Sequence, residues 1–332
     1  MPRSSPVVVG YDGSGRALSA LKWAAREAGD RGLPLRVVRA IPYAAVLEAA
    51  PGLAPGHRTT HEDKVLDEGI RVANMLLDPD QVSGVSIPGH PAGVLADASA
   101  HAALVVVGQR AQDGPVSSAV GSTSLVLADR APCPVAVARG ALAPERSLLP
   151  VVVGVTEDEG SRAALDFAAE TAELRDVPLT IVSAWSLPPT REWARSSPDF
   201  DTVAQVARHL KARAAAVAEA SKIYVHRHHP AVATRTEVEP LDAATALEIA
   251  SHRAGLLVVG ATGGRGPGSG GRSGDAGRTR LPGRGQVAQA VLGRAACPVV
   301  VVVPVRTATA DEAGASSHEV DTDATGSAPT NV

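Results

Sequence analysis

Short runs of apolar residues alternate along the chain with longer stretches whose apolar residues recur at helical spacing. The first run, 7–9, consists of valines and ends at Gly10. From about residue 16, apolar side chains return every three or four positions, which predicts one buried helix face, at Leu18, Leu21, Ala25 and Ala28. Continuous Val-rich runs are typical of parallel strands buried on both faces. Alternating strands and helices therefore predict a parallel sheet with helices on both sides.

The first half of the chain contains five such strands, at 7–10, 36–41, 84–87, 104–107 and 135–139. Helices are expected from about residue 16, from about residue 61 and at 92–100, and a Pro/Gly-rich stretch at 51–56 interrupts regular structure. In the second half, a long helix is expected at 203–220, followed by a connection that contains His226, His228 and His229. A metal site would need further ligands on the same face, so a solvated connection is favoured for these histidines.

The pattern is duplicated. The segment Val-Val-Val-Gly that ends at Gly10 returns ending at Gly154, 144 positions later, and 21–25 matches 165–169 at the same shift. The run 104–108 returns at 256–260, and Cys-Pro-Val at 133–135 returns at 297–299. The order is kept and the shift grows only between the matched segments, which indicates a duplicated domain with insertions in loops. We call the two repeats the first and the second copy.

These repeats set the expected domain boundaries. The first domain is 1–140, a linker without periodicity is 141–149, and the second domain is 150–305. The second copy carries a Gly/Arg-rich insert, 264–284, of a composition typical of flexible segments. The last residues, 306–332, are rich in Ala, Thr, Asp, Gly and Ser, and we expect this acidic tail to be disordered.

Bulk composition narrows the classes of function. The 332 residues suggest two domains, and the net charge of −3 gives no reason to expect nucleic acid as a partner. No run of 18 apolar residues exists, so no membrane partner is expected. The N-terminus enters the first strand without an apolar signal region, and only two cysteines are present, so we expect a cytoplasmic protein without disulfides.

Candidate chemistry follows the ends of the first and fourth strands, where ligands bind in doubly wound folds. After Gly108, a further glycine opens the next helix, at Gly121, Ser122, Thr123 and Ser124. The free N–H groups at the start of a helix, together with side-chain hydroxyls, can bind phosphate. The alternative is an ordinary turn and helix N-cap. Asp12 follows the first strand and could accept a hydrogen bond from an adenine amino group or a ribose hydroxyl; the alternative is a simple Asp-Gly turn.

Taken together, these motifs resemble the universal stress protein family. The resemblance rests on Val-Val-Val-Gly-x-Asp-Gly-Ser, a second Val-Val-Val-Gly strand, a glycine loop ending in Gly-Ser and a final Cys-Pro-Val, and it covers nearly the whole chain in tandem form. It implies two α/β, doubly wound domains of the adenine nucleotide alpha hydrolase-like type. Each would be a five-stranded parallel sheet of order 3-2-1-4-5 with helices on both faces. Members often pair through their last strands, which implies a homodimer or a pseudo-dimer within the chain.

The resemblance also implies site residues. Asp12 matches the acid that contacts adenosine, and Ala40 matches a position that lines the adenine pocket. The phosphate loop would start at Gly108 and end at 121–124, with Arg110 offsetting the charge of a neighbouring Asp113. Ala111 departs from the pattern, because the family has glycine there. The implied ligand is ATP, with or without Mg²⁺, and no metal site of the protein's own is expected.

The second copy departs further from the pattern. Thr156 stands where the first copy has Asp12, and the loop start is kept by Gly260 and Gly263. The end of the loop, Gly285 and Gln286, arrives only after the insert, and Gln286 replaces the serine. The resemblance therefore implies at most a weak second site.

We expect a nucleotide-binding regulatory protein of the stress response rather than a dedicated enzyme. Slow ATP hydrolysis is the most catalysis that we expect, since no residue is an evident general base. The main alternative is an interaction module whose nucleotide sites have decayed, acting on an unknown protein partner. An enzyme acting on a small phosphorylated substrate would need a base or a metal site near Gly121, which the sequence does not supply.

Overall fold

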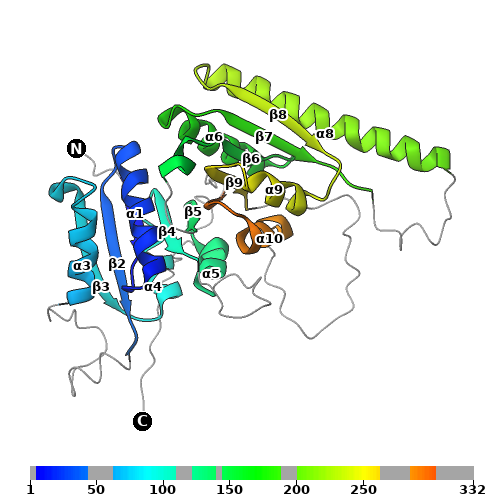
Figure 1. Ribbon diagram of the computed structural model, residues 1–332. Coiled ribbons are helices and arrows are strands. Elements are labelled where there is room, and N and C mark those ends of the chain that lie inside the picture. Colours follow the sequence, from blue (N-terminus) through cyan, green and yellow to red (C-terminus); the bar gives the residue numbers. More distant parts are fainter. Residues whose placement is uncertain are drawn as a thin grey trace, which may run out of the picture.

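The computed structural model describes residues 5–43, 63–109, 122–139, 144–187, 200–261 and 285–303. Its elements follow the predicted order of alternating strands and helices in both copies (Figure 1). In the first copy they are β1 (Val7–Gly10), α1 (Gly15–Asp30), β2 (Leu35–Ile41), α3 (Lys64–Ala73), the 3-10 helix Pro79–Gln81, β3 (Val82–Pro88), α4 (Pro91–Ser99), β4 (Leu104–Gly108), α5 (Ser122–Arg130) and β5 (Val135–Ala138).

The second copy repeats this order after a 3-10 helix at Pro144–Leu148, which lies within the expected linker. Its elements are β6 (Val151–Gly154), α6 (Glu159–Leu174), β7 (Leu179–Ala184), α8 (Phe200–His228), β8 (Thr234–Glu239), α9 (Ala243–Ser251), β9 (Leu256–Gly260), α10 (Gln286–Arg294) and β10 (Val299–Val302). The insert 264–284 and the tail 306–332 lie outside the described residues.

The ten strands of the described residues form one sheet, in the order β3-β2-β1-β4-β5-β10-β9-β6-β7-β8. Each copy therefore has the order 3-2-1-4-5, as the family resemblance implies, and its strands run parallel. The two halves meet where β5 and β10 pair antiparallel, with Ala136 opposite Val300 and Val135 opposite Val301. The last strands thus pair within the chain, around a pseudo-twofold axis.

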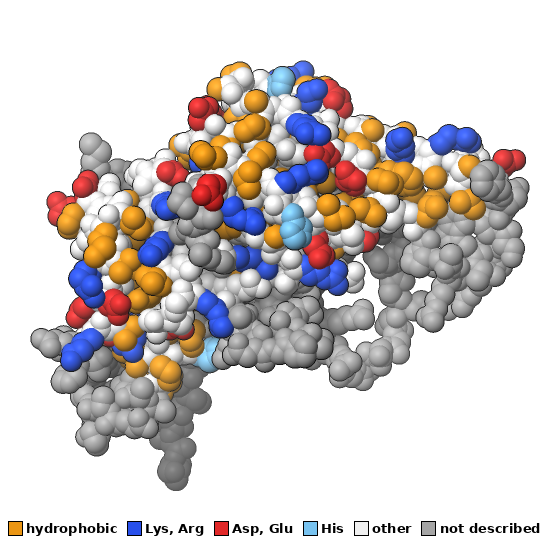
Figure 2. Space-filling view, in the orientation of Figure 1, with side chains coloured by type: hydrophobic (Ala, Val, Ile, Leu, Met, Phe, Trp, Pro, Cys, Tyr) orange, Lys and Arg blue, Asp and Glu red, His pale blue; other side chains and the backbone are white. Residues whose placement is uncertain are grey.

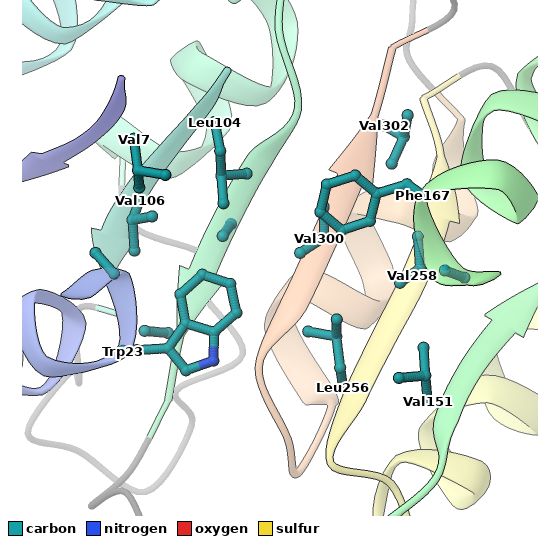
Figure 3. Packing of buried hydrophobic residues seen from close by; sticks show 14 of the residues in the cluster. Val7, Trp23, Leu104, Val106, Val151, Phe167, Leu256, Val258, Val300 and Val302 are labelled. Carbon is teal, nitrogen blue, oxygen red and sulfur yellow. The ribbon is translucent and has the colours of Figure 1, made fainter. Parts of the chain in front are cut away.

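Alternate strand residues point to opposite faces, which separates the core into two layers. One layer packs Val7, Val9 and their counterparts against α1, α3, α6 and α8, and it continues from the first copy into the second. The other layer packs Val8 and its counterparts against α4, α5, α9 and α10. Figure 3 shows the first layer where it crosses between the copies, with the indole of Trp23 beside β5 and the ring of Phe167 near Val300 of β10.

Polar contacts between α1 and α6 close this layer at the interface of the copies. The carboxylate of Glu27 is 1% exposed and lies between two arginines, one from each copy. Arg31 donates to Glu27 at 2.8 Å and to the hydroxyl of Thr171 at 2.7 Å, and Arg175 also donates to Glu27. A buried carboxylate held this way is compensated by two opposite charges.

The same two arginines cover the aromatic rings of the opposite copy. The guanidinium of Arg31 lies 4.5 Å from the ring centre of Phe167, and that of Arg175 lies 6.0 Å from the ring centre of Trp23. Both distances are in the range of cation–π contacts. The contacts are pseudo-symmetric, because each arginine and each aromatic residue has its counterpart 144 positions away.

On the other face, Arg139 joins the end of the first copy to a helix of the second. Its guanidinium donates to the carbonyl oxygens of Ala295 at 2.9 Å and Val291 at 3.3 Å, at the C-terminus of α10. A cation is favourable there because the last carbonyls of a helix carry a partial negative charge. Burial lowers the pKa of the Arg139 guanidinium.

The prediction for α8 was wrong in length. The helix has 29 residues and ends at His228, so His226 and His228 lie in its last turn rather than in a connection. The rings of Tyr224 and His228 stack at 4.1 Å, an i,i+4 contact that supports the extra turn. Figure 1 shows α8 running well past the ends of β7 and β8. None of the helices in the described ranges is both long and apolar enough to cross a membrane.

Candidate functional site

A cavity of about 440 Å³ opens at the carboxyl ends of β1 and β4, the edge at which the sequence predicts a site. Five of the predicted site residues line it: Asp12, Ala40, Gly108, Thr123 and Ser124. Ser122 begins α5, but its side chain is not described, and Arg110, Ala111 and Gly121 lie outside the described residues. The fold therefore brings together residues that are more than 100 positions apart in the chain.

The turn after β1 fixes Asp12 at the mouth of the cavity. The backbone N–H of Ser14 donates to Oδ1 of Asp12 at 3.0 Å, and Gly13 has a φ of +81°, which favours glycine. Ser14 then caps α1, because its hydroxyl accepts from the N–H of Ala17 at 3.2 Å. Asp12 forms the Asp-Gly turn, and it also lines the cavity, so its role toward a ligand stays a prediction.

Gly108 lets β4 end directly against the first turn of α1. A Cβ at this position would lie 2.7 Å from the carbonyl oxygen of Arg16, closer than real contacts allow. In the second copy, a Cβ at Gly260 would lie 2.6 Å from the carbonyl oxygen of Gly160. Packing therefore requires this glycine in both copies, and its presence alone is no evidence for a ligand.

The wall of the cavity is apolar at one end and polar at the other. Val38, Ala40 and Leu95 contribute aliphatic surface, whereas Thr123 and Ser124 come from the first turn of α5. Ser124 is 2% exposed. The N-terminus of a helix offers free N–H groups and a partial positive charge, so the polar end suits an anionic group.

Sequence reasoning missed several lining residues: Tyr11, Ser14, Arg16, Pro91, Leu95 and Gln109. Tyr11 is 3% exposed, and burial, followed by the nearby carboxylates of Glu68 and Asp12, raises its pKa. Gln109 is held by a hydrogen bond from its N–H to the carbonyl oxygen of Ala138 at 3.0 Å. Arg16 could have been predicted from the sequence, because it is a charged residue at the start of a helix, directly after the Asp-Gly-Ser turn.

The equivalent cavity in the second copy measures about 110 Å³. Thr156 and Gly260 line it in place of Asp12 and Gly108, and Ser161 stands where the first copy has Ala17. The hydroxyl of Ser161 lies 2.9 Å from Oγ1 of Thr156 and accepts from the N–H of Thr156 at 2.8 Å. These side chains satisfy each other instead of pointing free groups at a ligand.

Two further residues of the predicted second site, Gly285 and Gln286, lie at the start of α10. Gly285 precedes the helix without a side-chain cap, and its N–H donates to the carbonyl oxygen of Ala261 at 2.9 Å. Gln286 is the first residue of α10 and is exposed. Gly263 lies outside the described residues. Val287, rather than a hydroxyl, lines the small cavity from this helix.

The two copies also differ in the charge of the residues that follow their first strands. The turn and first helical residues of the first copy read Gly13, Ser14, Gly15 and Arg16, whereas residues 157–160 of the second copy read Glu-Asp-Glu-Gly. One of these acids, Glu157, is paired with Arg213 at 2.6 Å. An anion in the first-copy cavity would meet Arg16 as well as Asp12, whereas residues 157–159 of the second copy are all acidic.

Neither thiol chemistry nor metal binding finds support in the described part of the chain. The thiols of Cys133 and Cys297 are buried, and burial raises their pKa to about 11 and about 12, so both stay protonated near neutrality. Among the described residues, no group of three His, Cys, Asp or Glu side chains could hold a metal ion. Acidic and basic side chains are interspersed over the face drawn in Figure 2 rather than gathered in one basic patch.

The strand order defines a tandem, doubly wound α/β protein, with a cavity at the carboxyl ends of β1 and β4. The sequence profile of the universal stress protein family matches residues 4–139 and 149–303. The chain belongs to the universal stress protein family.

Individual relatives agree with this assignment. A universal stress protein of Mycobacterium tuberculosis is 34% identical over 182 residues, 54% of this chain, and the match spans only 64% of that relative's length. A universal stress protein of Mycolicibacterium smegmatis is 28% identical over 90% of this chain and 97% of its own length.

The structure of a universal stress protein from Archaeoglobus fulgidus shares the fold, with a TM-score of 0.55 and 15% identity over 91% of this chain and 99% of that chain. Two further universal stress protein structures, one in complex with cAMP and one, from Archaeoglobus fulgidus, with dAMP, match at TM-scores of 0.23 and 0.29. The ligands cAMP and dAMP belong to the structures of those two proteins.

Proposed function

We propose that this universal stress protein binds an adenine nucleotide, ATP, in the first-copy cavity and acts as a nucleotide-dependent regulatory protein. The observation that carries the proposal is the cavity of about 440 Å³ lined by Asp12, Ala40, Gly108, Thr123 and Ser124. Nucleotide binding would order the surrounding surface and shift the population of states that a partner recognises.

The size and the chemistry of the cavity support this ligand. Small-molecule sites typically measure about 300–1,000 Å³, with mostly apolar walls and a few placed polar groups. Val38, Ala40 and Leu95 offer an aliphatic wall for a base, and Asp12 offers an acceptor for ribose or amino groups. The first turn of α5 offers N–H groups and hydroxyls to phosphates, and Mg²⁺ would accompany the phosphates rather than bind to a protein site.

The second-copy cavity supports an asymmetric protein with one working site. Its volume of about 110 Å³ lies well below the usual range for ligand sites. If both sites were inactive, the chain would instead serve as an interaction module built on a rigid pseudo-dimer. A partner protein, or a second copy of the chain, is a prediction in either case.

Titration calorimetry on the full chain tests the proposal, with ATP, ADP, AMP and adenosine as ligands, in the presence and absence of Mg²⁺. We expect one binding site per chain. Asp12→Asn keeps the oxygen that accepts from Ser14 but removes the charge, and we expect it to weaken binding about tenfold. Thr156→Ala, at the equivalent position of the second copy, is the matched control and leaves binding unchanged.

Three results would contradict the proposal. No heat with any of these ligands, and no nucleotide released from the purified chain on denaturation, would make the protein an interaction module. Two equal sites would remove the asymmetry. Steady turnover of Mg-ATP at enzyme-like rates would favour an enzyme over a regulatory protein.

A further inference from the structure

We infer that Arg16 makes the first-copy site selective for nucleotides with several phosphates, by binding the phosphate chain with its guanidinium. The inference rests on the proposed function and names a residue outside the motif that carries the family resemblance. It predicts that the site binds ATP more tightly than AMP or adenosine, and not only that it binds a nucleotide.

The position of Arg16 follows from the packing of α1 on β4. Its carbonyl oxygen lies against Gly108, 2.7 Å from the place where a Cβ would be, and Arg16 itself lines the cavity. Gly108 ends β4, and the hydroxyl residues Thr123 and Ser124 reach the same cavity from α5. The side chain of Arg16 therefore leaves the backbone close to the end of the cavity proposed for phosphates.

The side chain is also available. Arg16 is exposed, and within the described residues it makes no ion pair and no hydrogen bond through its side chain. Its pocket-lining neighbours Asp12 and Ser14 are engaged with their own turn, since Oδ1 of Asp12 accepts from the N–H of Ser14 at 3.0 Å. A free guanidinium at a cavity mouth is suited to a planar, two-bond contact with phosphate oxygens.

The placement runs against local helix preferences. Acidic residues stabilise the first turn of a helix and basic residues destabilise it, because the free N–H groups carry a partial positive charge. The first turn of α1 contains no acidic residue and contains Arg16 instead. A bound anion removes this conflict, because it compensates the guanidinium and the helix end together.

The second copy provides the contrast. Gly160 occupies the place of Arg16, and the neighbouring positions are Glu157, Asp158 and Glu159. α6 thus starts with the acidic residues that suit a helix N-terminus and that repel an anion. Arg16 and the uncharged residues 13–15 before it are therefore features of the first-copy cavity and not of the fold that both copies share.

The test compares affinities of the full-length chain for ATP, AMP and adenosine in wild type and variants. We expect Arg16→Ala to weaken ATP about tenfold, AMP less and adenosine less than twofold, because adenosine has no phosphate to lose. Arg16→Lys keeps the charge but not the planar fork, so its loss for ATP is expected to be about threefold. Lys22→Ala removes an exposed cation from the same helix, outside the cavity, and leaves all three affinities unchanged.

The outcomes separate this inference from the proposed function. Equal weakening of ATP and adenosine in Arg16→Ala would assign Arg16 a role in supporting α1 and overturn the inference alone. Wild-type protein that binds neither ATP nor adenosine would overturn the proposed function and the inference together. Circular dichroism and thermal unfolding of each variant check that the chain is folded with unchanged helix content, and added salt is expected to reduce the difference between wild type and Arg16→Ala for ATP.

Discussion

The two copies have the same strand order, yet they differ at the edge where ligands bind in this type of fold. At that edge, Gly10 and Gly154 both pack against a leucine, and Gly108 and Gly260 both pack against a helix backbone. Around these shared glycines, the cavity measures about 440 Å³ in the first copy and about 110 Å³ in the second. The glycines therefore preserve the fold, while the side chains beside them differ together with the volume of the cavity.

The interface between the copies shows the same kind of asymmetry in a buried network. Arg31 and Arg175 are counterparts, but Glu27 of the first copy corresponds to Thr171 of the second. One buried carboxylate therefore serves two arginines. Matched substitutions at counterpart positions can separate residues that stabilise the shared fold from residues that serve only one copy.

The largest effect is expected at this interface. Glu27→Ala leaves Arg31 and Arg175 without their shared buried carboxylate, and we expect the free energy of unfolding to fall by about 3 kcal/mol. Thr171→Ala removes one hydroxyl that accepts from Arg31 at 2.7 Å, which is expected to cost about 1 kcal/mol. Urea denaturation of the two variants measures both values. Equal losses of unfolding free energy in the two variants would mean that Glu27 and Thr171 stabilise the interface equally, although their side chains differ.

A smaller effect is expected at the paired glycines. Gly108→Ala and Gly260→Ala each force a methyl group against a carbonyl oxygen, at 2.7 Å and 2.6 Å, and we expect each to destabilise the fold by about 2 kcal/mol. Only Gly108→Ala should also weaken ATP binding, because it displaces the first turn of α1 beside the larger cavity. Calorimetry at a temperature where both variants remain folded checks this. Loss of ATP binding in Gly260→Ala would show that the second copy contributes to the site.

Much of this arrangement could be predicted from the sequence. The repeat, the alternation of strands and helices and the family resemblance led to the correct strand order. Asp12, Ala40, Gly108, Thr123 and Ser124 were predicted as site residues, and they do line one cavity. Parallel strands bring their carboxyl ends to one edge, so residues that follow different strands meet there.

The rest could not be predicted, because it depends on contacts between elements that are distant in sequence. Leu95 reaches the cavity from α4, and nothing in its apolar pattern distinguishes it from a core residue. Val225 of α8, beyond the predicted end of the helix, is buried in the core layer that also contains Ile181 of β7. The second-copy cavity is enclosed by residues of β6, β7, α9, β9 and α10, which are distant from one another in the chain. A pattern in one segment does not specify any of these contacts.

The smallest effect concerns helix starts, and it depends on pH. Asp63 caps α3 and also contacts Arg39 and Ser86, whereas Asp242 caps α9 of the second copy through the N–H of Thr245 at 3.1 Å. Burial opposes ionisation of Asp63, but its hydrogen bonds with Arg39, Ser86 and the N–H of Leu66 outweigh burial and hold its pKa below the ordinary value. Asn caps helices about as well as Asp, so replacement by Asn isolates the charge.

We expect Asp63→Asn to lower the free energy of unfolding at pH 7 by about 1 kcal/mol, and Asp242→Asn to change it by only a few tenths. Because the pKa of Asp63 is lower in the folded chain, its stabilisation is complete above the unfolded pKa of about 3.9 and is lost as the pH falls through the folded value. The difference between wild type and Asp63→Asn should therefore be constant from pH 5 to 7 and shrink below about pH 4. Urea denaturation at several pH values measures it, and a difference that persists at the lowest pH would mean that the substitution disturbs packing rather than charge.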